Sequence, residues 1–173
     1  VVDDTLVVEE KGINSVEKFL LARRLMYWQV YRHKTVVASE NMLVKIIERA
    51  QFLFAKGNKE IKTNTKLDIF LDNFSGNIKD ISLDAFCQLD DTDILFAIKK
   101  WQHHEDKVLS ILCHGILNRK CFSCQMQDKN ITEKDWLTAW QIAKERFNVN
   151  DTDLSYLCFK GSTSNTLYDV SDE

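Results

Sequence analysis

The feature that most constrains this chain is a long helical pattern that runs from about Val16 to Ala55. Its first half is apolar on nearly every side, and a helix of that kind is normally buried. Basic and phenolic side chains nevertheless occur within it at helical spacing. The pattern therefore predicts a cationic, hydroxyl-bearing strip on a buried helix. This strip comprises Arg23, Arg24, Tyr27, Tyr31 and Lys34.

Two interpretations of the strip remain open. Buried charge without a partner is costly, so the strip is expected to face a ligand, another protein or a satisfied polar network. In the alternative, its cations reach solvent or pair with carboxylates such as Glu17 and Glu40. Helix geometry alone favours this second, purely structural interpretation.

Composition limits the function classes. A chain of 173 residues can form one good core, or one core with a small appendage. The net charge of −3 argues against nucleic acid as an obligate partner. No apolar run approaches the roughly 20 residues that span a bilayer. We therefore predict no membrane and no obligate nucleic acid.

The cysteines and the N-terminus indicate the setting of the chain. The five cysteines are an odd number without a regular spacing, which fits free thiols in a reducing cytosol and predicts a cytoplasmic protein. The N-terminus has no initiator Met and no basic region of a signal peptide. We expect the chain to be part of a longer polypeptide.

Capping residues and periodicity predict mostly helices. The pattern from Val16 to Ala55 is long for a globular helix, so a kink or break is expected in it. Further helices are expected over 83–88, from Asp91 onward with a break near the His103–Asp106 cluster, and over 133–147. The expected N-caps are Ser15, Ser82, Asp90 and Thr132, while residues 67–74 fit either a short helix or irregular structure.

Three short apolar segments fit strands instead: residues 2–10, 121–127 and 154–159. The predicted fold class is mainly α, with a helical domain over residues 1–120. A small α/β appendage with an acidic tail is predicted over residues 121–173.

Two clusters have the residue types of metal or redox sites. His103, His104 and Asp106 could hold a metal if a helix break brings them together, although adjacent ligands are poorly spaced on a helix. Cys121 and Cys124 form a lone C-x-x-C without a convincing second ligand pair. For both clusters we favour a structural role, a solvated polar helix junction and inert thiols, and we predict no metal ligands in this chain.

The segment from Lys11 to Thr35 resembles the metal-dependent phosphohydrolases of the HD superfamily. It is similar to the branch related to deoxynucleoside triphosphate (dNTP) triphosphohydrolases, which has K-G-x-x-S-x-E-x-F-L-x-A-R followed by R-x-x-M-Y-x-x-V-Y-x-H-K. Later similarity falls at Leu89–Ile94, Trp101, His104, Asp106 and Leu117–Lys120. The resemblance thus covers most of residues 2–125 and implies a helical-bundle portion of an HD-type domain.

The resemblance implies a substrate-binding role for the strip. By position, Arg23 would contact phosphate, Tyr27 would lie near the reacting phosphoryl group, and Tyr31 would pack on the deoxyribose. His33 and Lys34 match positions that help to bind a regulatory nucleotide at a subunit interface in some relatives. These roles imply a nucleotide partner and a homo-oligomer.

The metal-binding motif of the superfamily is not found in this chain. The sequence contains no His-Asp dipeptide, and the family's metal-binding helices precede the segment at which the chain begins. The resemblance therefore implies a C-terminal region whose intact protein uses a divalent metal to hydrolyse nucleotides, while the fragment alone is inactive. The alternative is a helical module that performs no chemistry and mediates oligomerisation or binds a regulatory ligand.

Overall fold

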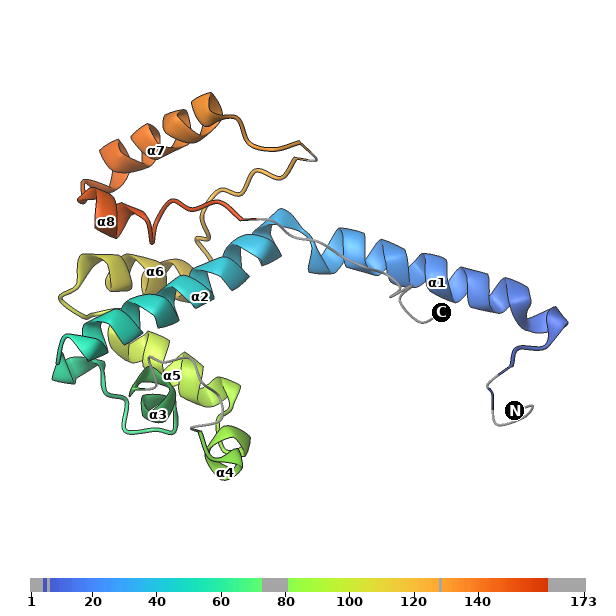
Figure 1. Ribbon diagram of the computed structural model, residues 1–173, viewed down its shortest axis with the longest axis horizontal. Helices are drawn as coiled ribbons and strands as arrows, with labels where there is room; N and C mark the ends of the chain where they lie inside the picture. The colour runs from blue at the N-terminus through green and yellow to red at the C-terminus, as the bar shows by residue number, and fades with distance from the viewer. Residues whose placement is uncertain (1–4, 6, 73–80, 128, 162–173) are drawn as a thin grey trace. The chain divides into compact units, whose positions relative to one another are not determined.

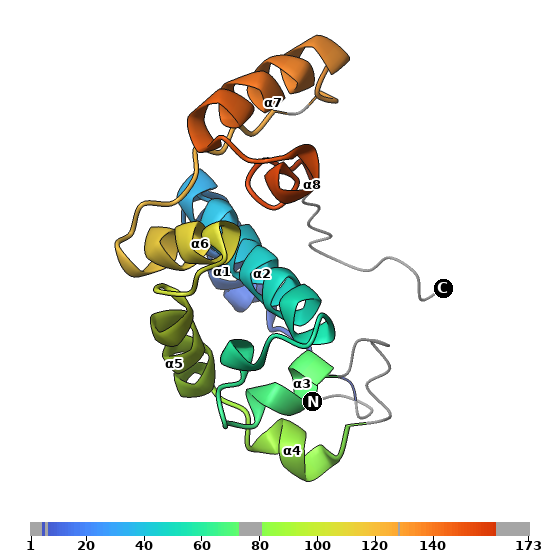
Figure 2. The same ribbon diagram turned by 90° about the vertical axis from the view of Figure 1, so that its left-hand side faces the viewer.

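The computed structural model describes residues 5, 7–72, 81–127 and 129–161, and its described regular structure is helical. The chain divides into two compact units, Val1–Met126 and Gln127–Glu173. The prediction of a mainly α protein is confirmed. Figures 1 and 2 show the helices of each unit from two directions.

The long N-terminal pattern forms two helices and a wider turn between them. Helix α1 (Ile13–Met26) follows the short 3-10 turn η1 (Glu10–Gly12) and leads into the π-helix η2 (Tyr27–Tyr31). Helix α2 (Lys34–Ala55) begins after a break at His33, whose backbone is extended. The predicted break is confirmed, whereas the prediction of Ser15 as N-cap is wrong because η1 already starts the helical path before it.

Helix α2 ends where the sequence changes to polar residues. Gly57 follows the C-cap Lys56 with a φ of 81°, a left-handed conformation that glycine adopts without strain. The amide of Asn58 then donates to the carbonyl of Leu53 at 3.1 Å, which satisfies an end carbonyl of the helix. The chain continues into the 3-10 turn η3 (Lys59–Ile61) and helix α3 (Leu67–Asp72).

Helices α2, α5 (Asp91–Trp101) and α6 (Lys107–Leu117) build the core of the first unit, with α6 packed against both α2 and α5 (Figures 1 and 2). Gly115 permits the close approach of α6 to α2, because a Cβ there would lie only 2.6 Å from Cε of Met42. The largest side chains of this unit that are fully buried are Met42, Ile46, Ile61, Leu71, Ile98, Trp101, Val108, Leu109, Leu112 and Cys113.

Local capping sets the remaining helix starts as the sequence predicts. Ser82 caps helix α4 (Leu83–Cys87), Asp90 forms a capping box with Asp93 at the start of α5, and Thr132 caps α7 (Glu133–Phe147). In the second unit α7 is followed by the short helix α8 (Asp151–Leu154), which Asn150 caps.

Predictions of strand structure are wrong where the structure describes the residues. Residues 121–127 have no regular structure, and the segment 154–159 starts at the end of α8 and continues in turns. In the first segment, residues 1–4 and 6 lie outside the described residues, Thr5 forms an isolated bridge, and Glu10 already belongs to η1. The described part of the appendage is therefore helical and irregular, without a strand.

Candidate functional site

Three residues of the predicted strip form one cluster on the C-terminal end of α1 and on η2. A guanidinium nitrogen of Arg23 donates to the hydroxyl of Tyr27 at 3.5 Å, and its central carbon lies 4.9 Å from the centre of the Tyr27 ring. The rings of Tyr27 and Tyr31 lie 5.1 Å apart and are tilted by 50°. Arg23, Tyr27 and Tyr31 thus offer one positive charge and two hydroxyls side by side. We call this set the tyrosine cluster.

The π turn explains how the tyrosine cluster comes together. The amide of Arg32 donates to the carbonyl of Tyr27 at 3.0 Å, a hydrogen bond that spans five residues rather than the four of an α-helix. The wider turn carries both tyrosines, and such turns occur often at functional sites. The sequence predicted that these residues share a face, but it gave no signal for the π turn itself.

His33 and Lys34 lie beyond the break, and the structure gives His33 a local role. The Nδ1 atom of His33 accepts a hydrogen bond from the amide of Thr35 at 3.3 Å, so the imidazole caps the N-terminus of α2. Lys34 is the first residue of α2, on the other side of the break at His33 from the tyrosine cluster in the sequence.

The burial predicted for the first half of the long pattern is not found in this chain. No residue of α1 or η2 is buried, and Phe19 and Trp28 are 66% and 67% exposed. The reason is that within the described chain no other helix packs along α1, whereas α2 is covered by α6 and α3. Among the described residues, no ion pair joins Arg23, Arg24 or Lys34 to Glu17 or Glu40. The apolar surface of α1 and the tyrosine cluster are both exposed.

The His103–Asp106 cluster forms a structural junction between α5 and α6. The carboxylate of Asp106 accepts two hydrogen bonds from Arg49 of α2, at 3.1 and 2.6 Å, and caps α6 through the amide of Leu109. Burial alone would raise the pKa of Asp106. The hydrogen bonds from Arg49 and Leu109, with the charge of Arg49, outweigh burial and hold this pKa below its ordinary value.

The same junction fixes His104, whose side chain is only 3% exposed. Its Nδ1 atom accepts a hydrogen bond from the amide of Asp106 at 2.9 Å. Where residues are described, no group of three or more His, Cys, Asp or Glu side chains is arranged to hold a metal ion. The carboxylate of Asp106 is hydrogen-bonded to Arg49, and His104 is held by the amide of Asp106. The geometry therefore favours the predicted polar helix junction over a metal site.

The thiols differ in exposure. Cys113 is buried in α6, and burial raises its pKa to about 12, so the thiol stays protonated and unreactive. Cys121 and Cys124 are half-buried and not in a disulfide. No helix in the described part of the chain has the length and apolarity that a membrane span needs.

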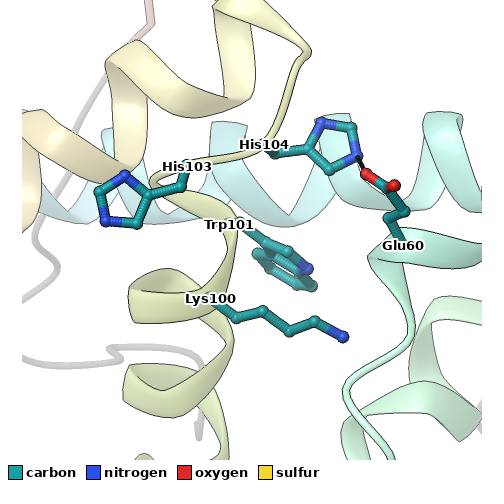
Figure 3. Close-up of a pocket in the computed structure, with 5 residues that line it drawn as sticks. All are labelled: Glu60, Lys100, Trp101, His103 and His104. Atoms are coloured by element: carbon teal, nitrogen blue, oxygen red, sulfur yellow. Dashed lines mark ion pairs between the residues drawn. The ribbon is translucent and has the colours of Figure 1, made fainter.

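Sequence reasoning missed an open pocket of about 260 Å³ at the other end of α5 from its capping box (Figure 3). Its lining comes from η3 and from the end of α5 with the turn that follows it. These segments are separated by some forty positions in the sequence, and no local motif joins them. The lining residues are Glu60, Lys100, Trp101, His103 and His104.

This chain is similar to known proteins in sequence and in structure. Residues 1–70, which include α1, η2 and α2, match the family described as HD associated region. The chain is 41% identical to a phosphohydrolase from Bacteroides thetaiotaomicron of known crystal structure, with a TM-score of 0.81 over 90% of this chain and 40% of that one. It is also 32% identical over 167 residues to the uncharacterized protein YwfO of Bacillus subtilis, covering 96% of this chain and 36% of that protein.

The family match and the structural similarity support the HD superfamily as the context of this chain. The chain spans about two fifths or less of the length of the relatives that it matches. The activity and substrate of a whole protein are therefore treated below as proposals.

Proposed function

We propose that this chain is part of a metal-dependent HD-type phosphohydrolase that hydrolyses a nucleotide, with a dNTP as the specific expectation. The observation that carries the proposal is the tyrosine cluster: Arg23, Tyr27 and Tyr31 lie within contact of one another on an exposed π turn. The match of residues 1–70 to the HD associated region, and the similarity to a phosphohydrolase, support it.

The cluster has the chemistry that a nucleotide triphosphate requires. The guanidinium of Arg23 would bind phosphate oxygens with two parallel hydrogen bonds, since its planar fork matches their geometry. The hydroxyl of Tyr27, which already accepts from Arg23, would donate to a neighbouring phosphoryl oxygen. Tyr31 would offer its ring to the deoxyribose, because its face is half exposed beside Tyr27.

We propose that residues outside the described part of this chain hold the catalytic metal. The described residues contain no suitable group of ligands, and the sequence contains no His-Asp pair. A divalent metal bound elsewhere in the intact protein would activate water and polarise the phosphoryl oxygen. The role of this chain is then to bind and orient the substrate, and the chain alone is inactive.

The exposed apolar surface of α1 supports the same proposal. A helix that is apolar on nearly all sides is stable when other segments surround it. In the intact protein, we propose, the metal-binding domain covers α1 and so faces the tyrosine cluster. Phe19 and Trp28 are exposed in this chain, as expected if another domain packs against them in the intact protein.

We also propose roles for His33 and Lys34 and a cellular setting from the cysteines. His33 and Lys34 would help to bind a regulatory nucleotide between subunits of a homo-oligomer. Binding of an anion there would compete with the capping role of His33, because its Nδ1 atom already accepts from Thr35. The free cysteines fit a cytoplasmic protein without disulfides.

Substitution of the cluster in the intact protein tests the substrate role. Arg23→Ala should lower kcat/KM for the preferred nucleotide by about 10- to 100-fold, the value of a lost charged hydrogen bond. Tyr31→Ala should lower it by about tenfold, since the ring that would pack on the deoxyribose is lost. Neither change should alter the unfolding midpoint, because both side chains are exposed or half-exposed.

Lys18→Ala is the matched control. Lys18 is an exposed cation on α1. It lies five residues before Arg23, so the helix turns its side chain away from the side that carries Arg23. If Arg23→Ala and Tyr31→Ala retain the kinetics of the Lys18→Ala variant, the cluster does not contact substrate. A screen of nucleotides with Mg²⁺ and transition metals that shows no release of phosphate or triphosphate would refute the enzymatic proposal as a whole.

A non-catalytic helical module is the second candidate, and the exposed apolar residues of α1 are what favour it. In that case the intact protein would change its oligomeric state with nucleotide but release no product. Mass measurement in solution, with and without dNTP, combined with the product assay, separates the two functions.

A further inference from the structure

Helix α5 has one buried face and one exposed face. Ala97, Ile98 and Trp101 are fully buried on one side of the helix. Leu95 and Phe96 lie on the other side and are 50% and 49% exposed, although both side chains are large and apolar. Adjoining exposed apolar side chains on a helix form a candidate surface for contact with another protein.

Charges of opposite sign flank Leu95 at equal spacing. Asp91 lies four residues before Leu95, and Lys99 lies four residues after it. Residues four apart share one side of a helix, so these three side chains form a single line, which we call the α5 stripe. Asp91 and Lys99 are both exposed, and neither forms an ion pair with another described residue of the chain.

The α5 stripe is complementary to a reversed copy of itself. In an antiparallel pair with a twofold axis at Leu95, Asp91 of each copy lies opposite Lys99 of the other, because both are about 6 Å along the helix from Leu95. A parallel pair would instead place like charges opposite each other, which is unfavourable. The order of acid, apolar residue and base therefore fits a second, antiparallel copy of this chain.

We propose that the α5 stripe is a contact between two copies of this chain, packed antiparallel about a twofold axis. Leu95 packs against the partner's Leu95, and two symmetric ion pairs flank this apolar centre. One helix pair is small for a protein interface, so this contact should associate reversibly and depend on concentration. The inference assigns a surface to the homo-oligomer proposed above, and it does not depend on nucleotide hydrolysis.

Charge reversal in the intact protein, followed by sedimentation velocity over a series of concentrations, tests this proposal. Lys99→Glu places carboxylates opposite each other at both ends of the contact, and Asp91→Lys places ammonium groups there. Each variant alone should weaken self-association by at least about tenfold, because attraction at two symmetric positions becomes repulsion. Lys134→Glu is the matched control: it makes the same charge change at an exposed position of α7 and should retain wild-type association.

A mixture of the two variants is the decisive measurement. When a Lys99→Glu subunit pairs with an Asp91→Lys subunit, opposite charges again face each other at both ends, so the mixture should associate as the wild-type protein does. Misfolding cannot produce this recovery, because a misfolded variant would not regain association on mixing. The proposal is overturned if the mixture sediments as the two separate variants do, if the single variants associate like Lys134→Glu, or if the wild-type protein is monomeric at every concentration.

The same variants distinguish a different occupant of the α5 stripe. If the rest of the intact polypeptide covers it, both variants should lower the unfolding midpoint and mixing should restore nothing, which also overturns the proposal. Nucleotide hydrolysis is assayed in parallel. Its absence would refute the proposed enzymatic function and leave the result of the mixing experiment unaffected.

Discussion

Asp106 shows how one side chain can decide the geometry of a junction. Its carboxylate bonds to Arg49 of α2 and caps α6, while its backbone amide bonds to His104. Arg49 is fifty-seven residues away in the sequence, so no local pattern could reveal the pair. The sequence placed Asp106 in a candidate metal cluster, and only the fold shows that its oxygens are already used.

The Asp106 carboxylate should make stability depend on pH. Its folded pKa is lowered, so it stabilises the fold above the unfolded value of about 4 and loses this effect as pH falls through the folded pKa. Asp106→Asn should therefore cost about 3 kcal/mol at pH 7, because Arg49 would keep a nearly buried charge without its counter-ion. Urea denaturation between pH 7 and pH 2 measures both effects.

Asp84→Asn is the control for this prediction. Asp84 is exposed on α4 and bonds to the side chain of Gln88, so its substitution should change the free energy of unfolding by less than about 0.5 kcal/mol. An Asp106→Asn variant with the same acid sensitivity as the wild-type chain would show that the carboxylate does not contribute to the pH dependence.

At the scale of single elements, helix starts follow from local chemistry. Asp90 accepts from the amides of Thr92 and Asp93, and Asp93 accepts in return from the amide of Asp90. Asp90→Ala should lower the free energy of unfolding by about 1 kcal/mol, whereas Asp90→Ser should retain most of it. Chemical denaturation followed by circular dichroism measures the difference, and equal losses in the two variants would contradict the capping role.

Because helix caps act over only a few residues, the sequence could predict the helix starts. Caps at Ser82, Asp90 and Thr132 were predicted because each acts on amides two or three residues away. The strand predicted over 121–127 is wrong because a short apolar segment forms a strand only where a neighbouring strand can pair with it. The π turn was not predictable, since its residues are equally suited to an α-helix.

At the scale of the whole molecule, the chain contains a well-covered part and an uncovered part. Helices α2, α5 and α6 carry fully buried side chains, whereas α1 carries none. Hydrogen exchange should therefore be slow in α2, α5 and α6 of the isolated chain and much faster in α1. In the longer protein that we propose, α1 should become as protected as α6. Slow exchange of α1 in the isolated chain would show that α1 is stable without another segment packed against it.

The burial of α1 is also where the sequence and this chain disagree most. A helix that is apolar on nearly every side is expected to be buried, but no residue of α1 is buried in this chain. The prediction is therefore wrong for this chain, because no other helix of the described residues packs along α1. The tyrosine cluster was predictable because its members lie four residues apart, whereas the pocket beside η3 joins segments distant in sequence.

The π turn has a consequence for how the helices before and after it are phased. Because the turn holds one residue more than an α turn, it acts as a local insertion that rotates every later position relative to α1. Loss of a single residue between Tyr27 and Tyr31 would let the segment return to α geometry, with Tyr31 three residues after Tyr27 and still on the same face of the helix. The change would instead fall on the residues after the turn, which would rotate around the helix axis relative to α1.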